Sequence, residues 1–362
     1  MRVLVTGGAG FVGSALSRLF LTSGAASRVV AFDNLRRRGS ERNVELLGSA
    51  GVTFVHGDVR SPDDFAGLEG TFDLVVDASA EPSVHAGTGS LGVRYLFDTN
   101  LAGTLNCLEF CRERAGGLIF LSTSRVYCID ALRAIPLVEE ATRLSPSTTG
   151  QPHGMSIAGV SEDFATTGQG FRSLYGTTKL ASELFVEEYA RNFDLPAIVN
   201  RCGVIAGPGQ FGKVDQGVFT LWVAAHLYGH ELAYHGFGGA GRQVRDLLHP
   251  LDLFALIRRQ ASSLDAYRGD VFGVGGGMVG SASLLEYTGL CQEATNREIK
   301  IGRREEISAV DIPFFVTDHT RVSQEFGWFP ERGPRTIVGD ITEWLKVGGE
   351  SVAQLFGGSG TV

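Results

Sequence analysis

The 362-residue sequence lacks the features of a membrane, secreted or nucleic-acid-binding protein. It has no apolar run long enough to cross a bilayer, and its first predicted strand begins at residue 1, which leaves no room for a signal peptide. Acidic residues outnumber basic ones by 40 to 32, so no basic surface for nucleic acid is expected. The five cysteines are odd in number and form no Cys-x-x-Cys, which favours free thiols in a reducing cytoplasm.

Patterns of metal ligands are also sparse. His226 and His230 lie four residues apart, as two ligands on one helix face would, but no glutamate follows His226 in the manner of His-Glu-x-x-His. We interpret them as a core or surface pair and expect no metal site.

A glycine-rich turn follows the first strand-like segment. After an apolar run over residues 1–6, the chain reads GGAGFVG over residues 7–13. Glycine permits a tight turn and close approach of a pyrophosphate, whose charge the start of the next helix attracts. A second apolar run over residues 28–32 ends at Asp33, twenty residues beyond Gly13, where an acid binds a ribose 2′-hydroxyl. This order of elements predicts a dinucleotide-binding site.

A tyrosine and a lysine, Tyr175 and Lys179, open a segment that is predicted to be helical to about Arg191. At this spacing both side chains lie on one helix face. A neighbouring ammonium favours the phenolate, so we expect Lys179 to lower the pKa of Tyr175 from its ordinary value of about 10. Such a phenol can take a proton from an alcohol near neutral pH. The alternative is an exposed pair without function.

Strand-like and helical segments alternate along most of the chain. Further apolar runs occur at 52–56, 74–77, 118–121 and 197–200, and long helices are predicted over about 95–114 and 176–191. The alternation predicts an α/β fold, a doubly wound parallel sheet of the Rossmann type. Beyond about residue 202, glycine-rich stretches predict a smaller α/β substrate-binding lobe.

We place the dinucleotide-binding domain at residues 1–202 plus roughly 246–276, and the substrate lobe at 203–245 and 277–356. Residues 357–362 are predicted to be a flexible tail. Residues 143–161, which are rich in Ser, Thr, Gly and Pro, are predicted to form a mobile loop or lid before the Tyr175 helix.

Six motifs in this order resemble the extended short-chain dehydrogenase/reductase superfamily, specifically its nucleotide-sugar epimerases and dehydratases. They are GGAGFVG at 7–13, GDV at 57–59, NLAGT at 100–104, LSTSRVY at 121–127, Tyr-x-x-x-Lys at 175–179 and RDLLHPLD at 245–252. The resemblance covers nearly the whole chain. It implies an NAD-dependent cytoplasmic enzyme, a homodimer or homotetramer, that acts on a CDP- or UDP-linked sugar.

The resemblance also implies roles for individual residues. Tyr175 would be the catalytic base, Lys179 would bind the nicotinamide ribose, and Thr123 would hydrogen-bond the reacting hydroxyl. The residues expected to bind NAD are Gly7, Gly10, Phe11, Val12, Gly13, Asp33, Asn34, Asp58, Val59, Ala78, Ala80, Asn100, Tyr175 and Lys179. The alternative role of Asn100 is to tie down its helix. The residues expected to bind the substrate are Thr123, Gln210, Gln216 and Arg245.

Within the superfamily, segments 33–39, 209–217 and 311–318 are most similar to the CDP-paratose 2-epimerase group. This similarity implies inversion of C2 by transient oxidation through tightly bound NAD. Ser124-Arg125 stand where 4,6-dehydratases have Asp-Glu after the catalytic threonine, which weighs against dehydration, and Val204 stands where the family commonly has a substrate-binding Asn.

Other functions stay open. One is a UDP-sugar 4-epimerase or another nucleotide-sugar oxidoreductase of the superfamily. A different class is a non-catalytic dinucleotide-binding protein, which would not need Thr123, Tyr175 and Lys179.

The cofactor and the subunit interface each have an alternative as well. The arginines at 36–38 could attract the 2′-phosphate of NADP, but Asp33 would repel it, so NAD is favoured. Leu180, Leu184 and Phe185 are candidate apolar anchors between subunits, unless they pack on their own sheet.

Overall fold

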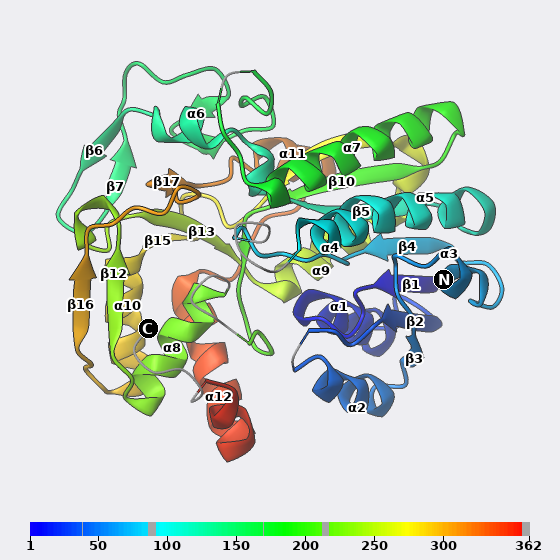
Figure 1. The fold of residues 1–362 in the computed structure, drawn as a ribbon, viewed down its shortest axis with the longest axis horizontal. Coiled ribbons are helices and arrows are strands. Elements are labelled where there is room, and N and C mark those ends of the chain that lie inside the picture. Colours follow the sequence, from blue (N-terminus) through cyan, green and yellow to red (C-terminus); the bar gives the residue numbers. More distant parts are fainter. Residues whose placement is uncertain (38, 86–91, 169, 212–216, 357–362) are drawn as a thin grey trace.

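The computed structural model describes residues 1–37, 39–85, 92–168, 170–211 and 217–356. A parallel sheet of seven strands, in the order β14-β10-β5-β4-β1-β2-β3, forms the right-hand part of Figure 1. Its strands are β1 (Arg2–Thr6), β2 (Arg28–Asp33), β3 (Thr53–His56), β4 (Leu74–Asp77), β5 (Leu118–Thr123), β10 (Ala197–Cys202) and β14 (Arg268–Val274). The predicted α/β class with a doubly wound parallel sheet is confirmed.

Helices cover both faces of this sheet. One face packs against α1 (Phe11–Thr22), α2 (Glu41–Ser49), α9 (Pro250–Ser262) and α11 (Thr320–Phe326). The other face packs against α3 (Pro62–Ala66), α5 (Gly103–Arg114) and α7 (Leu174–Asn192). Because the sheet is buried on both sides, its strands are continuous apolar runs rather than alternating ones.

The direction of strand order reverses between β1 and β4. The chain runs outward from β1 through β2 to β3 and then returns to β4 on the other side of β1. Loops that leave the carboxyl ends of β1 and β4 therefore diverge, and such a switch point opens a crevice for a ligand.

The helix predicted over 95–114 is present but contains an irregular turn. It consists of α4 (Val93–Phe97), the π-helical turn η1 (Asp98–Ala102) and α5. At the start of the short helix α3, the Ser61 hydroxyl accepts from the Asp64 N–H and proline takes the first helical position.

A smaller lobe lies on the left of Figure 1 and has a core of its own. Its helices are α8 (Val218–Tyr228), α10 (Leu284–Thr295) and α12 (Pro334–Phe356), and its short strands are β11 (Val204–Ile205), β12 (Leu232–His235), β13 (Val244–Leu248), β15 (Ser281–Ser283), β16 (Ile301–Arg304) and β17 (Phe314–Phe315). Two further turns, η3 (Phe237–Gly239) and η4 (Leu264–Ala266), follow β12 and α9. The domain boundaries given above stay a prediction.

The segment predicted to be a mobile loop contains regular structure. It follows the turn η2 (Ser124–Val126), α6 (Ile129–Arg133) and β6 (Leu137–Glu139). It contains β7 (Leu144–Pro146), which forms a hairpin with β6, and the hairpin of β8 (Met155–Ser156) with β9 (Gly159–Val160). Backbone hydrogen bonds from Leu144 to Arg242 and from Val160 to Val316 fasten these hairpins to the smaller lobe.

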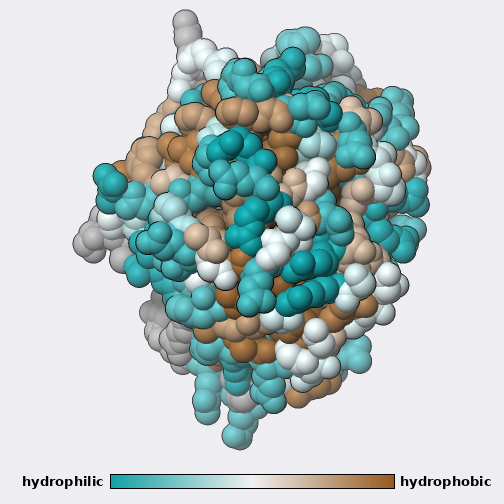
Figure 2. All heavy atoms as spheres, turned by 90° about the vertical axis from the view of Figure 1, so that its right-hand side faces the viewer, coloured by the Kyte–Doolittle hydropathy of each residue, from teal (hydrophilic) through white to brown (hydrophobic). Residues whose placement is uncertain are grey.

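Polar and apolar residues are mixed over the side of the sheet domain shown in Figure 2. No helix in the described part of the chain is both long and apolar enough to span a membrane. All five cysteines are buried, and none of them forms a disulfide bond. The predicted tail at 357–362 lies outside the described residues.

Candidate active site

A cleft of about 860 Å³ lies at the carboxyl ends of the sheet strands and reaches from the glycine turn to Tyr175. Predicted site residues that line it are Gly7, Gly10, Phe11, Val12, Gly13, Asp33, Asn34, Val59, Ala78, Ala80, Thr123, Tyr175 and Gln210. The fold therefore brings most of the predicted cofactor and catalytic residues into one cavity.

The glycine turn is shaped as a dinucleotide cradle. Gly7 has a φ of +63°, and a Cβ there would lie 2.8 Å from the Ala78 carbonyl oxygen. A Cβ at Gly13 would lie 2.1 Å from the Gly7 carbonyl oxygen, so only glycine lets α1 approach the turn this closely. Gly10 is the N-cap of α1, whose first N–H groups face an incoming phosphate. The residues present thus fit a bound pyrophosphate.

Asp33 ends β2 beside this turn. Its carboxylate accepts from the backbone N–H of Ala9 at 3.1 Å and of Leu35 at 2.8 Å. Burial raises the pKa of Asp33, while these backbone donors act in the opposite direction. The acid is held at the cleft wall, where a ribose hydroxyl can donate to it.

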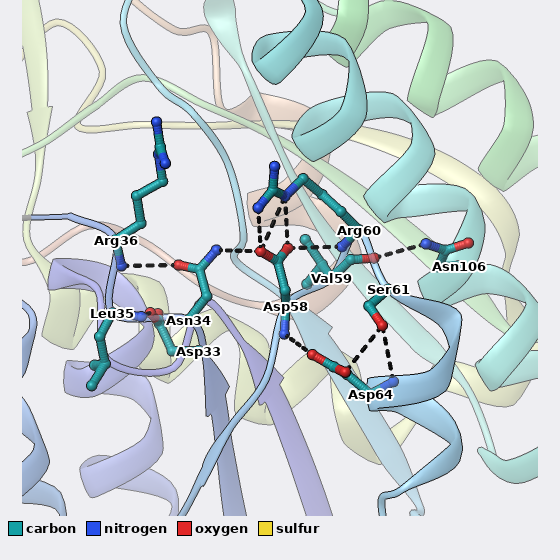
Figure 3. Close-up of polar contacts among 10 residues, drawn as sticks. All are labelled: Asp33, Asn34, Leu35, Arg36, Asp58, Val59, Arg60, Ser61, Asp64 and Asn106. Carbon is teal, nitrogen blue, oxygen red and sulfur yellow. Dashed lines mark hydrogen bonds and ion pairs between the residues drawn. The ribbon is translucent and has the colours of Figure 1, made fainter.

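Asp58 is held by partners within the chain and is not among the residues that line the cleft, so its predicted contact with the cofactor stays a prediction. Its carboxylate accepts hydrogen bonds of 2.6 to 3.1 Å from the Arg60 guanidinium and one of 2.9 Å from Asn34 Nδ2, as Figure 3 shows. These partners, the Arg60 guanidinium above all, hold the pKa of Asp58 at about 2 against the effect of burial. Asp58 therefore clamps the loops after β2 and β3 together, while Val59 faces the cleft.

A cation–π stack that the sequence did not reveal lies at this end of the cleft. The guanidinium carbons of Arg36 and Arg60 lie 4.0 and 4.8 Å from the centre of the Tyr95 ring. Arg36, which we considered as a phosphate ligand, is thus drawn onto an aromatic ring that also lines the cleft. Arg38 lies outside the described residues.

Tyr175 lies in the first turn of α7 and is 8% exposed. Ser173 caps the helix by accepting from the Gly176 N–H at 3.1 Å. Burial raises the pKa of Tyr175 to about 12, and a hydrogen bond from Thr123 opposes this rise. Thr123, at the end of β5, and the phenol therefore meet in the cleft, as expected for a base and its partner.

Lys179 lies one turn further along α7 and is 2% exposed. Its ammonium lies 3.9 Å from the centre of the Phe120 ring, and burial lowers its pKa. We expected Lys179 to lower the pKa of Tyr175, but in the chain itself burial outweighs any such effect. Its predicted contact with a nicotinamide ribose stays a prediction.

Asn100 takes the alternative role considered for it. Its side chain lies in the π-helical turn and is 1% exposed. The amide oxygen accepts from the Glu81 N–H at 2.7 Å, and the amide nitrogen donates to the Glu81 carbonyl and to Thr178 Oγ1, both at 3.2 Å. Asn100 thereby fixes the loop after β4, which lines the cleft, to α7.

Two of the predicted substrate-binding residues already have hydrogen-bond partners within the chain. Arg245, on β13, donates to Asp311 Oδ1 at 3.0 Å and to the Ile312 carbonyl at 2.7 Å, and burial lowers its pKa to about 10. Gln210 lines the cleft, but its amide donates to the Ile205 carbonyl at 3.0 Å. Gln216 lies outside the described residues.

Two further residues of the 245–252 motif bind within the chain. His249 caps α9 by accepting from the Leu251 N–H at 3.1 Å. Asp252 pairs with Arg332 at 2.5 Å and accepts from its backbone at 2.9 Å. The motif therefore fastens α9 to the segment that precedes α12.

A buried ion pair behind the site was not predicted from the sequence. The side chains of Glu183 and Arg201 are 3% and 9% exposed and lie 2.8 Å apart. The Ser122 hydroxyl also donates to Glu183. Because Glu183 stands four residues after Lys179, helical spacing alone would have placed it on the same face of α7 and could have drawn attention to it.

The histidine pair expected to be structural is split between core and surface. His226 is fully buried and its Nδ1 lies 2.7 Å from the Trp222 carbonyl, whereas His230 is exposed. No group of three potential metal ligands occurs in the described ranges.

Comparisons with known proteins agree with this geometry. A model of the NAD dependent epimerase/dehydratase family matches residues 3–275. CDP-paratose 2-epimerase of Salmonella typhi is 30% identical over 361 residues, covering 96% of this chain and 99% of that protein. UDP-glucose 4-epimerase of Corynebacterium glutamicum is 28% identical, with 97% of each chain covered.

Solved structures show the same fold. Pal from Bacillus thuringiensis superimposes with a TM-score of 0.78 at 24% identity, covering 96% of this chain and 99% of that one. UDP-glucuronic acid 4-epimerase of Bacillus cereus, in complex with UDP-glucuronic acid and NAD, gives 0.74 at 22% identity with the same coverage. With the family model matched over most of its length, the chain belongs to the NAD dependent epimerase/dehydratase family.

Proposed function

We propose that this protein is a nucleotide-sugar epimerase that inverts one sugar carbon, C2 of a CDP-linked dideoxyhexose, with NAD held throughout. One observation carries the proposal: Thr123 and Tyr175 line the same cleft as the glycine turn and Asp33. A cofactor held by the turn and a sugar held near the tyrosine would share one cavity. The substrate class is supported by the 30% identity to CDP-paratose 2-epimerase.

Each residue of the site has a defined task in this reaction. The glycine turn and Asp33 would hold NAD, which would supply reversible hydride transfer at the sugar carbon. Thr123 holds the reacting hydroxyl by a hydrogen bond, and Tyr175 takes its proton and gives it back. Asp33 selects a free ribose 2′-hydroxyl by accepting from it. Arg245 offers a planar fork to the diphosphate, in exchange for its present contact with Asp311.

The test is a panel of CDP-, UDP- and GDP-sugars followed by proton NMR in deuterated water. Inversion at one carbon without deuterium at that carbon supports the proposal, because its hydrogen then never exchanges with solvent. Deuterium at that carbon indicates proton abstraction and refutes the mechanism. Net NADH release indicates a dehydrogenase instead.

A 4-epimerase of UDP-sugars is the second candidate, supported by the 28% identity to UDP-glucose 4-epimerase. The same residues would serve either reaction, so the panel decides between them by the carbon that inverts. For the non-catalytic alternative, Tyr175→Phe is decisive. It should lower kcat by roughly 10²–10⁴-fold with bound NAD unchanged, whereas a binding protein has no turnover to lose.

We also infer that two copies pair through α5 and α7. Leu184 and Phe185 on α7 are 58% and 40% exposed, whereas Leu180 packs into a core cluster of its own chain. Two of the three candidate anchors are thus available for a partner subunit. The buried free thiols support a reducing compartment, and we place the protein in the cytoplasm.

A further inference from the structure

Two arginines pack on the ring of Tyr95, but they are held there differently. Tyr95 is a half-buried residue of α4, and the guanidinium carbons of Arg36 and Arg60 lie 4.0 and 4.8 Å from its centre. Arg60 is also paired with Asp58 at 2.6 Å. Arg36 forms no ion pair within the ranges that the structure describes, and the contact shown for its guanidinium is the ring. The position of the Arg36 charge therefore depends on Tyr95.

The loop after β2 directs Arg36 away from Asp33. The Asp33 side chain accepts from the Leu35 N–H at 2.8 Å, and the Asn34 side chain accepts from the Arg36 N–H at 3.0 Å. Leu35 has a φ of +55°, in the left-handed region that a bulky residue rarely adopts. Such strain persists where surrounding contacts impose it, and it concentrates at ligand sites. Figure 3 shows the Arg36 side chain extending away from the Asp33 carboxylate.

Another position of Arg36 would change the cofactor that the site accepts. Arg36, Asp33 and Tyr95 line one cleft, and Arg36 stands three residues after the acid that is expected to accept from the ribose 2′-hydroxyl. A guanidinium that left the ring could pair with this carboxylate and weaken its hold on the hydroxyl. It would also offer a planar fork to a 2′-phosphate, which the carboxylate alone repels. Off the ring, Arg36 therefore acts against NAD and in favour of NADP.

We propose that Tyr95 is a specificity-determining residue for the cofactor, whose ring holds the Arg36 guanidinium away from the adenosine ribose and so keeps the site selective for NAD over NADP. The proposal rests on the NAD binding described above and deepens it. Tyr95 lies outside the six family motifs, and the sequence attributed the exclusion of NADP to Asp33 alone.

The test measures cofactor preference without any turnover. Full-length protein is equilibrated with mixtures of NAD and NADP until the retained ratio is constant, then desalted, denatured and analysed by chromatography. The retained ratio divided by the supplied ratio gives the preference. We expect Tyr95→Leu to lower the preference for NAD by about fivefold, which corresponds to the cation–π contact that an exposed arginine must otherwise give up.

This effect should require the arginine. In the Arg36→Met background, which lacks the guanidinium, adding Tyr95→Leu should leave the preference unchanged. Tyr95→Phe keeps an aromatic face and should retain the preference of the parent protein. The proposal is overturned if Tyr95→Leu alone causes no shift. It is also overturned by equal shifts in both backgrounds, which would mean that the ring acts on the cofactor directly.

A matched control tests for a general loss of stability. Phe193→Leu removes another cation–π contact, in which the guanidinium carbon of Arg112 lies 5.4 Å from the ring centre, and neither residue is among those that line the cleft. The preference should therefore stay in place, and a shift equal to that of Tyr95→Leu overturns the assignment. If Tyr95→Leu fails to fold, Tyr95→Met removes the ring with a more flexible side chain, and the same comparisons apply.

Failure of this proposal can be told apart from failure of the NAD assignment. A parent protein that retains mostly NADP refutes the selection of NAD by Asp33, and the role of Tyr95 with it. In a parent protein that retains mostly NAD, the absence of a shift in Tyr95→Leu refutes the role of Tyr95 only. The epimerase reaction enters neither result, because no nucleotide sugar is present.

Discussion

Removing the charge of Glu183 should lower the free energy of unfolding far more than the loss of one hydrogen bond would. Glu183→Gln keeps the shape of the side chain but leaves Arg201, whose side chain is 9% exposed, without a counter-ion. Both Nε and a terminal nitrogen of Arg201 now donate to Glu183, at 2.8 to 3.1 Å. Breaking a buried pair on one side costs about 3–5 kcal/mol, because an uncompensated charge stays inside.

The same helix offers a matched control. Arg191 and Glu187 form an exposed pair on α7, with side chains 66% and 45% exposed. Arg191→Met should cost only about 0.3–0.5 kcal/mol, since an exposed pair at helical spacing is solvated and screened. Replacing both buried partners, in Glu183→Leu with Arg201→Met, should recover much of the loss, because no unpaired charge remains.

The assay is urea unfolding of the NAD-loaded protein, monitored by circular dichroism. The free energies of unfolding of the variants are compared at the transition midpoint. Since Ser122 also donates to Glu183 and precedes Thr123, we expect kcat of Glu183→Gln to fall as well. If Glu183→Gln costs no more than Arg191→Met, the reasoning from buried charge is refuted. An unchanged kcat would show that the network is not needed to place α7.

The other predictions test the cofactor, the substrate and the assembly. Gly13→Ala should abolish NAD retention, because its Cβ would meet the Gly7 carbonyl at 2.1 Å, whereas Gly48→Ala, with open space around it, should retain NAD. Denatured protein should release NAD rather than NADP, and Asp33→Ala should weaken NAD binding by about 1.5–3 kcal/mol; mostly NADP would contradict this. Arg245→Ala should raise KM for the nucleotide sugar without releasing NAD, and loss of NAD would place the residue in the other half of the cleft. Light scattering at micromolar concentration should show a dimer or tetramer that Leu184→Glu dissociates; a monomeric parent protein would exclude the interface.

Features that depend on neighbours in the sequence were predictable. The strand, glycine turn, helix and acid at 2–33 form one local unit, and the structure arranges them in that order. The helix carrying Tyr175 and the capped start of α3 also follow from short patterns. In each case the residues that determine the conformation lie within a few positions of it.

Contacts that depend on strand register were not predictable. Ser122 and Arg201 are 79 positions apart, yet the pairing of β5 with β10 sets them side by side, and Thr123 beside Cys202. The clamp of Asp58 by Arg60 and Asn34 likewise needs the loops after β2 and β3 to converge. A motif could mark Asp58 as important, but it could not reveal that its carboxylate is already occupied.

The acid–base strength of the site shows why spacing alone is insufficient. Helical spacing places Lys179 and Tyr175 on one face of α7, but Lys179 extends onto the Phe120 ring beneath the helix. The phenol is buried, which raises its pKa to about 12, and among its neighbours Thr123 and Arg125 are the groups that favour ionisation. Both belong to the end of β5 and its turn, about fifty residues earlier in the chain. The spacing of Tyr175 and Lys179 on one helix face therefore does not by itself determine the acid–base strength of the phenol.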